Sequence, residues 1–237
     1  YIVVATPRHD ETFSKMNVDQ WVNILAATQD RVRWLYNRKG VSYVSVSLNY
    51  GWKAGARYVH PHLEIITLPR LPPLIEQEAL AVQKSMNELG VCPMCSVINV
   101  ESAGPRQILV TDFYIAFTPW APRHLFEFRI FPKKHQISFL KATQKEIQDL
   151  AVMLRSTLGG MAKALNDPPF NLSLHISSEK KSTRQIHWHI EVYPQLTEWA
   201  GLEKGNWAYV IPIPPEQSAE ILGSMARKEL AEIVGVI

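Results

Sequence analysis

One histidine pattern occurs twice along the chain, and this duplication constrains the fold more than any other feature of the sequence. The first copy has His9, followed 51 residues later by the segment His60-Pro-His62-Leu-Glu64. The second copy has His135, followed 52 residues later by His187-Trp-His189-Ile-Glu191. The copies lie 127 positions apart (189 − 62 = 127), whereas solenoid repeats are about 20 to 50 residues long. The pattern therefore predicts a duplicated domain, in which one copy can carry the catalytic residues and the other can have a structural role.

The composition excludes several classes of protein. Of the 237 residues, 46% are hydrophobic and 20% are charged, as is usual for globular chains, and the net charge is only +3 (25 − 22). The Lys and Arg residues are spread along the chain without a basic stripe, so we expect no nucleic-acid partner. No apolar run approaches the roughly 18 residues of a membrane span, so we expect no membrane partner.

Each copy shows the same order of expected elements, strand–helix–strand–strand. In the first copy we predict a helix from Asn17 or Val18 to about Asn37 and a strand from Val41 to Leu48. In the second we predict a strand from Phe126 to Phe131, a helix opened by the capping box Thr143-Gln-Lys-Glu146, and a strand from Asn171 to Ile176. This order indicates an α+β fold with two antiparallel sheets and packed helices. We place the first repeat at residues 1–86 and the second, with a zinc knuckle, at 87–237. Because the second copy has a longer leading part, we expect a further segment before Tyr1.

The histidine segments have the residue types of a reactive or metal-binding site. Side chains alternate along a strand, so His60, His62 and Glu64 are predicted to share one face, as are their counterparts in the second copy. A neutral imidazole can attack phosphorus when a hydrogen bond to its other ring nitrogen selects the tautomer. The glycine loop that precedes the first segment, with Gly51 and Gly55, lets backbone N–H groups approach a phosphate. His60, His62 and Glu64 are therefore the candidate catalytic residues.

The joint pattern resembles the galactose-1-phosphate uridylyltransferase family of the histidine-triad superfamily. The resemblance covers nearly the whole chain and rests on six segments: Asn49-x-Gly51-x3-Gly55-x4-His60-Pro-His62, Pro132-Lys-Lys-His135, Pro169-Phe-Asn171, His187-Trp-His189-x-Glu191-x-x-Pro194, Ala200-Gly201-x-Glu203, and Pro215-Glu216. It implies a duplicated histidine-triad-like fold and a double displacement. In that reaction a histidine takes UMP from UDP-glucose and passes it to galactose 1-phosphate or a similar hexose 1-phosphate. It also implies a cytoplasmic enzyme.

The resemblance assigns a role to each matching residue. His62 is the expected nucleophile, oriented by the backbone around His60. Asn49, Gly51 and Gly55 are expected to hold the α-phosphate. Glu203 matches a ligand of the hexose hydroxyls that reaches the active site of the partner subunit in a homodimer.

Two positions depart from the family pattern. The family has Gln two residues after the nucleophile, where its amide donates to phosphoryl oxygens, but this chain has Glu64. An ionised carboxylate has no proton to donate and repels phosphate. The family tends to have a small Ser three residues before His60, where this chain has Arg57, whose guanidinium can bind phosphate.

Two sets of residues compete for a metal ion. The spacing Cys92-Pro-Met-Cys95 suits a metal knuckle or a redox pair. By analogy with the zinc site in the family's first half, zinc is expected at Cys92, Cys95, His135 and His187. The family's second metal, zinc or iron, is expected at Glu78, His175, His187 and His189. His187 cannot readily serve both sets. We expect at least one zinc ion with a mainly structural role.

Three functions remain open from the sequence. The first is the transfer of UMP between UDP-glucose and galactose 1-phosphate through His62. The second is a phosphorylase of nucleotides or nucleotide sugars, with phosphate as the acceptor. The third is a non-catalytic protein that binds zinc and nucleotides, which Glu64 in place of Gln makes plausible.

Overall fold

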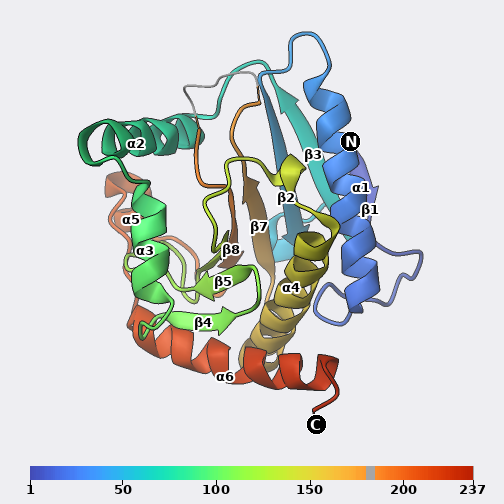
Figure 1. The fold of residues 1–237 in the computed structure, drawn as a ribbon. Coiled ribbons are helices and arrows are strands. Elements are labelled where there is room, and N and C mark those ends of the chain that lie inside the picture. Colours follow the sequence, from blue (N-terminus) through green and yellow to red (C-terminus); the bar gives the residue numbers. More distant parts are fainter. Residues whose placement is uncertain (180–184, 237) are drawn as a thin grey trace.

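The strands of both repeats join in one sheet. The structure is a computed structural model that describes residues 1–179 and 185–236. Eight strands pair in the order β1-β3-β2-β7-β8-β6-β5-β4, and every pair is antiparallel (Figure 1). The α+β class and the antiparallel pairing are thus confirmed. The expectation of two separate sheets is wrong, because β2 of the first repeat hydrogen-bonds directly to β7 of the second.

The elements have the following bounds. The strands are β1 (Ile2–Val4), β2 (Tyr43–Tyr50), β3 (His62–Leu68), β4 (Gln107–Val110), β5 (Tyr114–Phe117), β6 (Phe128–Pro132), β7 (Phe170–His175) and β8 (His189–Pro194). The helices are α1 (Val18–Tyr36), α2 (Pro73–Leu89), α3 (Pro93–Glu101), α4 (Gln144–Leu165), α5 (Gly201–Asn206) and α6 (Pro215–Ile233), with 3₁₀ turns η1 (Trp52–Ala54) and η2 (Phe139–Lys141). No helix in this described part of the chain is long and apolar enough to cross a membrane.

The two long helices predicted from the sequence cover one face of the sheet. The Asn17 side chain caps α1 by accepting from the Gln20 N–H at 2.8 Å, and the capping box predicted for Thr143 and Glu146 is present at the start of α4. α1 and α4 pack against each other, and α6 packs on α4 and β4 (Figure 1). The inward residues include the fully buried Val44, Leu48 and Leu150. Alternation then sends the polar residues of β2, β3, β7 and β8 to the opposite face.

The register of the sheet preserves the duplication. Ser47 pairs with Glu64 in the first repeat, and Ser173 pairs with Glu191 in the second. The two serines face each other where β2 meets β7. The histidine strands β3 and β8 therefore occupy equivalent places on either side of this junction.

Candidate active site

His62 lies at the first position of β3 with its tautomer fixed by the backbone. Its Nδ1 is 2.7 Å from the carbonyl oxygen of His60, which can only accept, so Nδ1 carries the proton. Nε2 is therefore the nitrogen with a free lone pair. The side chain is 4% exposed, and its ring contacts the ring of Tyr58 edge to face at a centroid distance of 5.6 Å. This is the arrangement that a nucleophilic imidazole requires.

A cavity of about 380 Å³ is lined in part by Tyr58, the ring that contacts His62. Its lining includes Asn49, Gly51, Arg57 and His60, all of which the sequence predicted at this site. His62 itself does not line the cavity, but its neighbours His60 and Pro61 do, and Tyr58, which is 59% exposed, contacts both the cavity and the His62 ring. The structure thus brings the predicted nucleophile and most of the predicted phosphate-binding residues to one place.

The glycine loop has the backbone geometry that glycine permits. Gly51 has φ +82° and Gly55 has φ +78°, values at which a side chain is strained. A Cβ on Gly51 would also lie 2.9 Å from Cβ of Pro169, so the loop packs closely against the start of β7. This contact joins the first repeat's loop to the second repeat.

A chain of amide hydrogen bonds ends at Glu64. The Gln195 amide donates to the Asn171 Oδ1 at 2.8 Å, and the Asn171 amide donates to the Asn49 Oδ1 at 2.7 Å. The Asn49 amide in turn donates to Oε2 of Glu64 at 3.5 Å, a long hydrogen bond. The Asn171 amide also donates to the Ala54 carbonyl at 2.7 Å. Gln195 was not predicted, because its side-chain partner, Asn171, lies on a different strand and no local pattern joins the two.

The ring of His60 contacts His9 and the backbone of Thr6. The two Nδ1 atoms are 3.0 Å apart, and Nε2 of His60 is 2.6 Å from the Thr6 carbonyl oxygen. The hydrogen bond between His60 and His62 is thus made by the backbone carbonyl of His60 and not by its ring.

Four residues form a group with the geometry of a zinc site. The ligand atoms of Cys92, Cys95, His135 and His187 lie within 4.8 Å of one another. Sγ of Cys95 is 3.4 Å from Nδ1 of His135 and 3.6 Å from Nδ1 of His187. A tetrahedral zinc ion with usual Zn–S and Zn–N bond lengths separates S and N by about 3.6 Å. The donor set and its spacing therefore fit zinc.

Protonation affects two ligands of this group, His187 and Cys95, in opposite ways. Nε2 of His187 donates to the Pro132 carbonyl at 3.0 Å, which leaves Nδ1 as the ligand. Burial, together with the neighbouring His135, lowers the pKa of His187 to about 4, so its imidazole is neutral at pH 7. Burial and the adjacent Cys92 raise the pKa of Cys95 to about 11, so metal binding has to release the thiol proton.

The second group differs from the set expected from the sequence. It contains Glu78, His175, His189 and Glu191, because His187 belongs to the cysteine group. β8 begins only at His189, so strand alternation does not govern His187. Nδ1 of His175 contacts Oε1 of Glu78 at 3.2 Å, and Nδ1 of His189 contacts the His187 carbonyl at 3.0 Å. Glu191 thus takes the place expected for His187 in the second group, and the two groups share no ligand. The sequence analysis did not assign Glu191 to a metal.

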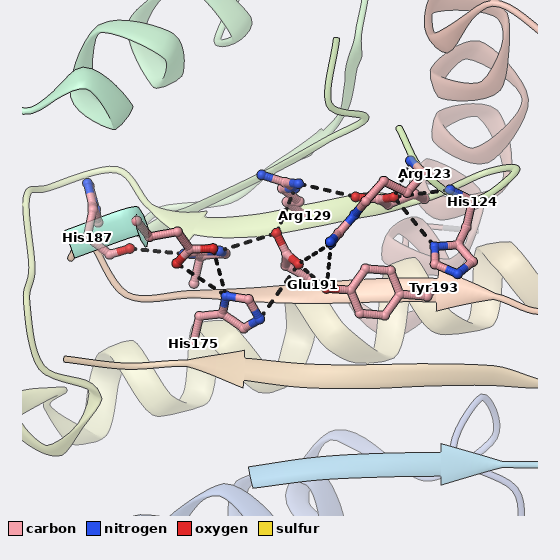
Figure 2. A network of polar contacts seen from close by, with 10 residues as sticks. Arg123, His124, Arg129, His175, His187, Glu191 and Tyr193 are labelled. Carbon is pink, nitrogen blue, oxygen red and sulfur yellow. Dashed lines mark hydrogen bonds and ion pairs between the residues drawn. The ribbon is translucent and has the colours of Figure 1, made fainter. Parts of the chain in front are cut away.

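Glu191 is also the centre of a buried ion-pair network (Figure 2). It is 1% exposed, and its carboxylate contacts Arg129 Nε at 2.9 Å and Arg123 Nη2 at 3.2 Å. The Tyr193 hydroxyl donates to the same carboxylate. Burial alone would raise the pKa of Glu191, but His189, His175 and Arg129 lower it well below its usual range. The sequence did not predict this network, because it joins charges on β6, β7 and β8.

Glu203 lies apart from these groups. Its carboxylate accepts from the Ala200 N–H at 3.0 Å and so caps the short helix α5. It does not line the cavity beside His62 in the described part of this chain. Within one copy of the protein, the structure therefore does not bring Glu203 to the predicted nucleophile.

The sequence is similar to those of enzymes that act on nucleotide sugars or sugar phosphates. No family model matches the chain. The chain is 28% identical over 226 residues to an ADP-glucose phosphorylase of Arabidopsis thaliana, and 28% identical over 230 residues to a galactose-1-phosphate uridylyltransferase of Thermotoga maritima. Each alignment covers 93% of this chain. It covers 63% of the Arabidopsis protein, which is less than two thirds, and 72% of the Thermotoga protein.

The fold is similar to those of solved structures of the same two kinds of enzyme. The crystal structure of an Arabidopsis thaliana ADP-glucose phosphorylase with bound ADP-glucose has a TM-score of 0.87 at 27% identity, covering 94% of this chain and 72% of that one. A structure of a uridylyltransferase has a TM-score of 0.89 at 27% identity, covering 96% of this chain and 74% of that one. Over nearly its whole length the chain is therefore similar, in sequence and in fold, to galactose-1-phosphate uridylyltransferases and to an ADP-glucose phosphorylase.

Proposed function

We propose that this protein transfers a nucleotidyl group between nucleotide sugars and sugar phosphates through a covalent intermediate on His62, with UDP-glucose and galactose 1-phosphate as its substrates. One observation carries the proposal: Nδ1 of His62 donates to the His60 carbonyl at 2.7 Å, and the His62 ring contacts Tyr58, which lines a cavity of about 380 Å³. Nε2 attacks the α-phosphorus, a P–N bond forms, and the bond to the leaving hexose phosphate breaks. The acceptor phosphate then reverses this step.

The lining of the cavity supports a phosphate-bearing substrate. Arg57 places a guanidinium in the lining, and Gly51 brings backbone close to the cavity without a side chain. Charge-assisted hydrogen bonds from arginine are strong and match phosphate geometry. His62 is outside both candidate metal groups of the described residues, so its ring remains available for attack.

The experiment is to trap the intermediate. The protein is incubated with UDP-glucose or ADP-glucose and analysed by intact mass and peptide mapping. We expect a UMP adduct on His62, no adduct in His62→Ala, and an unchanged adduct in the control His124→Gln. Absence of an adduct from either nucleotide sugar would contradict the proposal. If nucleotide binds tightly without turnover, the protein is a non-catalytic binder.

A phosphorylase is the second candidate, and a specific observation favours it. The Arabidopsis relative is named an ADP-glucose phosphorylase, and a similar solved structure holds ADP-glucose. With phosphate as the acceptor, ADP-glucose would yield ADP and glucose 1-phosphate. Release of ADP by phosphate, faster than transfer to galactose 1-phosphate, would select this function over the first.

We also propose a structural zinc ion at Cys92, Cys95, His135 and His187. Zinc there would hold the start of α3, the segment after β6 and the segment before β8 together. The group at Glu78 fits a metal less well. The guanidinium groups of Arg129 and Arg123 already neutralise Glu191, and they would repel a dication.

The proposal includes a homodimer in which Glu203 serves the partner's site. Glu203 is only partly buried on α5, and Trp207, whose backbone N–H donates to the Glu203 carbonyl, is 80% exposed. Mixing His62→Ala with Glu203→Ala subunits tests this arrangement, because a mixed dimer would have one intact site. Recovery of activity on mixing is expected, and its absence would place Glu203 outside the reaction.

A further inference from the structure

Glu64 is the one predicted active-site residue whose chemistry the proposed transfer does not use. It lies two residues after His62 on β3, so both side chains leave the same face of the strand, with Cα atoms about 7 Å apart. Its Oε2 accepts from the Asn49 amide, and Asn49 lines the cavity. Glu64 is therefore within reach of a group attached to the Nε2 of His62.

The hydrogen-bond chain defines what Glu64 can do. Every amide from Gln195 through Asn171 to Asn49 donates in the same direction, and the last donor is used by the Glu64 carboxylate. Asn49 therefore holds the carboxylate as an acceptor. A carboxylate cannot donate a hydrogen bond to a phosphoryl oxygen. Its remaining role toward a phosphorylated His62 is to accept a proton.

The charges around the intermediate favour a neutral acceptor. Arg57, also in the cavity lining, can neutralise the phosphoryl oxygens. A carboxylate beside the same phosphorus repels an incoming phosphate or sugar phosphate, but it binds water through a hydrogen bond. Water is therefore the acceptor that this carboxylate assists most.

We propose that Glu64 is a general base that directs water onto the nucleotidyl group carried by His62, giving the site a nucleotide-sugar hydrolase activity. The water oxygen forms a bond to phosphorus as the P–N bond to Nε2 breaks. The water proton passes to the Glu64 carboxylate and then to solvent, and the electron pair of the broken bond returns to Nε2. The products are the nucleoside monophosphate and free enzyme. This inference rests on the proposed intermediate on His62.

The experiment separates formation of the intermediate from its decay. The His62 adduct is formed with labelled UDP-glucose, freed of substrate, and followed in H₂¹⁸O with and without galactose 1-phosphate. We expect wild-type protein to release UMP carrying one ¹⁸O atom without any acceptor. Glu64→Gln, which keeps the shape of the side chain, is expected to slow this release about 100-fold, since general bases contribute about 10² to 10⁴. Transfer to galactose 1-phosphate should be as fast in Glu64→Gln as in wild type, or faster.

Matched variants make the outcome decisive. Glu220→Gln, an exposed substitution on α6, should release UMP at the wild-type rate. Glu64→Asp keeps a carboxylate and should retain part of the hydrolysis, which also covers the case in which Glu64→Gln does not fold. Equal rates of UMP release in wild type and Glu64→Gln would overturn this inference and leave the transfer proposal intact. If no adduct forms on His62 in either protein, the transfer proposal itself fails.

Discussion

Replacement of Asn171 by Ala tests the amide chain that joins the two repeats at the site. The Asn171 side chain makes three hydrogen bonds: it donates to Asn49 and to the Ala54 carbonyl at 2.7 Å each, and it accepts from Gln195 at 2.8 Å. A protein hydrogen bond contributes about 1 kcal/mol net. We therefore expect Asn171→Ala to lower the free energy of unfolding by about 3 kcal/mol, and Gln195→Ala by about 1 kcal/mol.

The shared bond makes the two substitutions non-additive. In the double variant the Gln195–Asn171 bond can be lost only once, so the expected cost is about 3 kcal/mol and not the additive 4 kcal/mol. Urea denaturation followed by circular dichroism measures all four free energies of unfolding. Asn171→Asp is the matched control. It keeps the acceptor for Gln195 but loses both donors, so it should cost at least two of the three bonds.

The same substitution should slow formation of the His62 adduct. Asn171 holds Asn49 in the cavity lining and the carbonyl of Ala54 in the glycine loop, so its loss frees both. A cost below about 1 kcal/mol for Asn171→Ala, or full additivity in the double variant, would refute the account of this chain as a connected unit.

Three further predictions concern the metal, a helix start and a close helix contact. Cys95→Ser should remove about one zinc ion per chain in metal analysis, because a serine hydroxyl is a poor zinc ligand, whereas Ser96→Ala should not. An unchanged zinc content would contradict the cysteine site. Thr143→Ala should cost about 1 kcal/mol at pH 7 by losing the capping box of α4. Partial burial opposes the shift, but hydrogen bonds from Thr143 lower the pKa of Glu146. The stabilisation is thus present above the ordinary carboxylate range and lost as the pH falls through the lowered pKa, so the difference from wild type should shrink in acid. Gly160→Ala should cost about 1 to 3 kcal/mol in urea denaturation, because its Cβ would lie 2.5 Å from the Ala226 nitrogen on α6. Gly205→Ala, which meets no atom within 4 Å, is its control and should cost nothing.

The sequence predicted those features that depend on local periodicity. The helix from Val18, the capping box at Thr143 and the antiparallel strands follow from spacing and capping residues, and the structure confirms them. The duplicated histidines also indicated where the cavity lies. Each of these signals is contained in a short stretch of chain.

Features that depend on distant partners were not predicted. Spacing alone could not show that β8 begins only after His187. As a result, His187 belongs to the cysteine group, and Glu191 belongs to the group of Glu78, His175 and His189. The Arg129–Glu191 pair joins β6 to β8, and the Gln195 bond joins the end of β8 to β7. The α3 helix was also missed, because its first residue, Pro93, lies inside the cysteine knuckle.

The continuous ladder from β2 to β7 has a consequence for how this protein can be divided. The registered pairs run from Val46 with Leu174 to Tyr50 with Phe170, so each repeat completes the other's hydrogen bonding. If the chain were cut between the repeats and the pieces were expressed alone, β2 and β7 would become open edges. Unprotected edge strands recruit other chains and lead to aggregation. Each repeat is thus expected to need the other in order to stay folded and unaggregated. Co-expressed pieces should reassemble, and single pieces should precipitate.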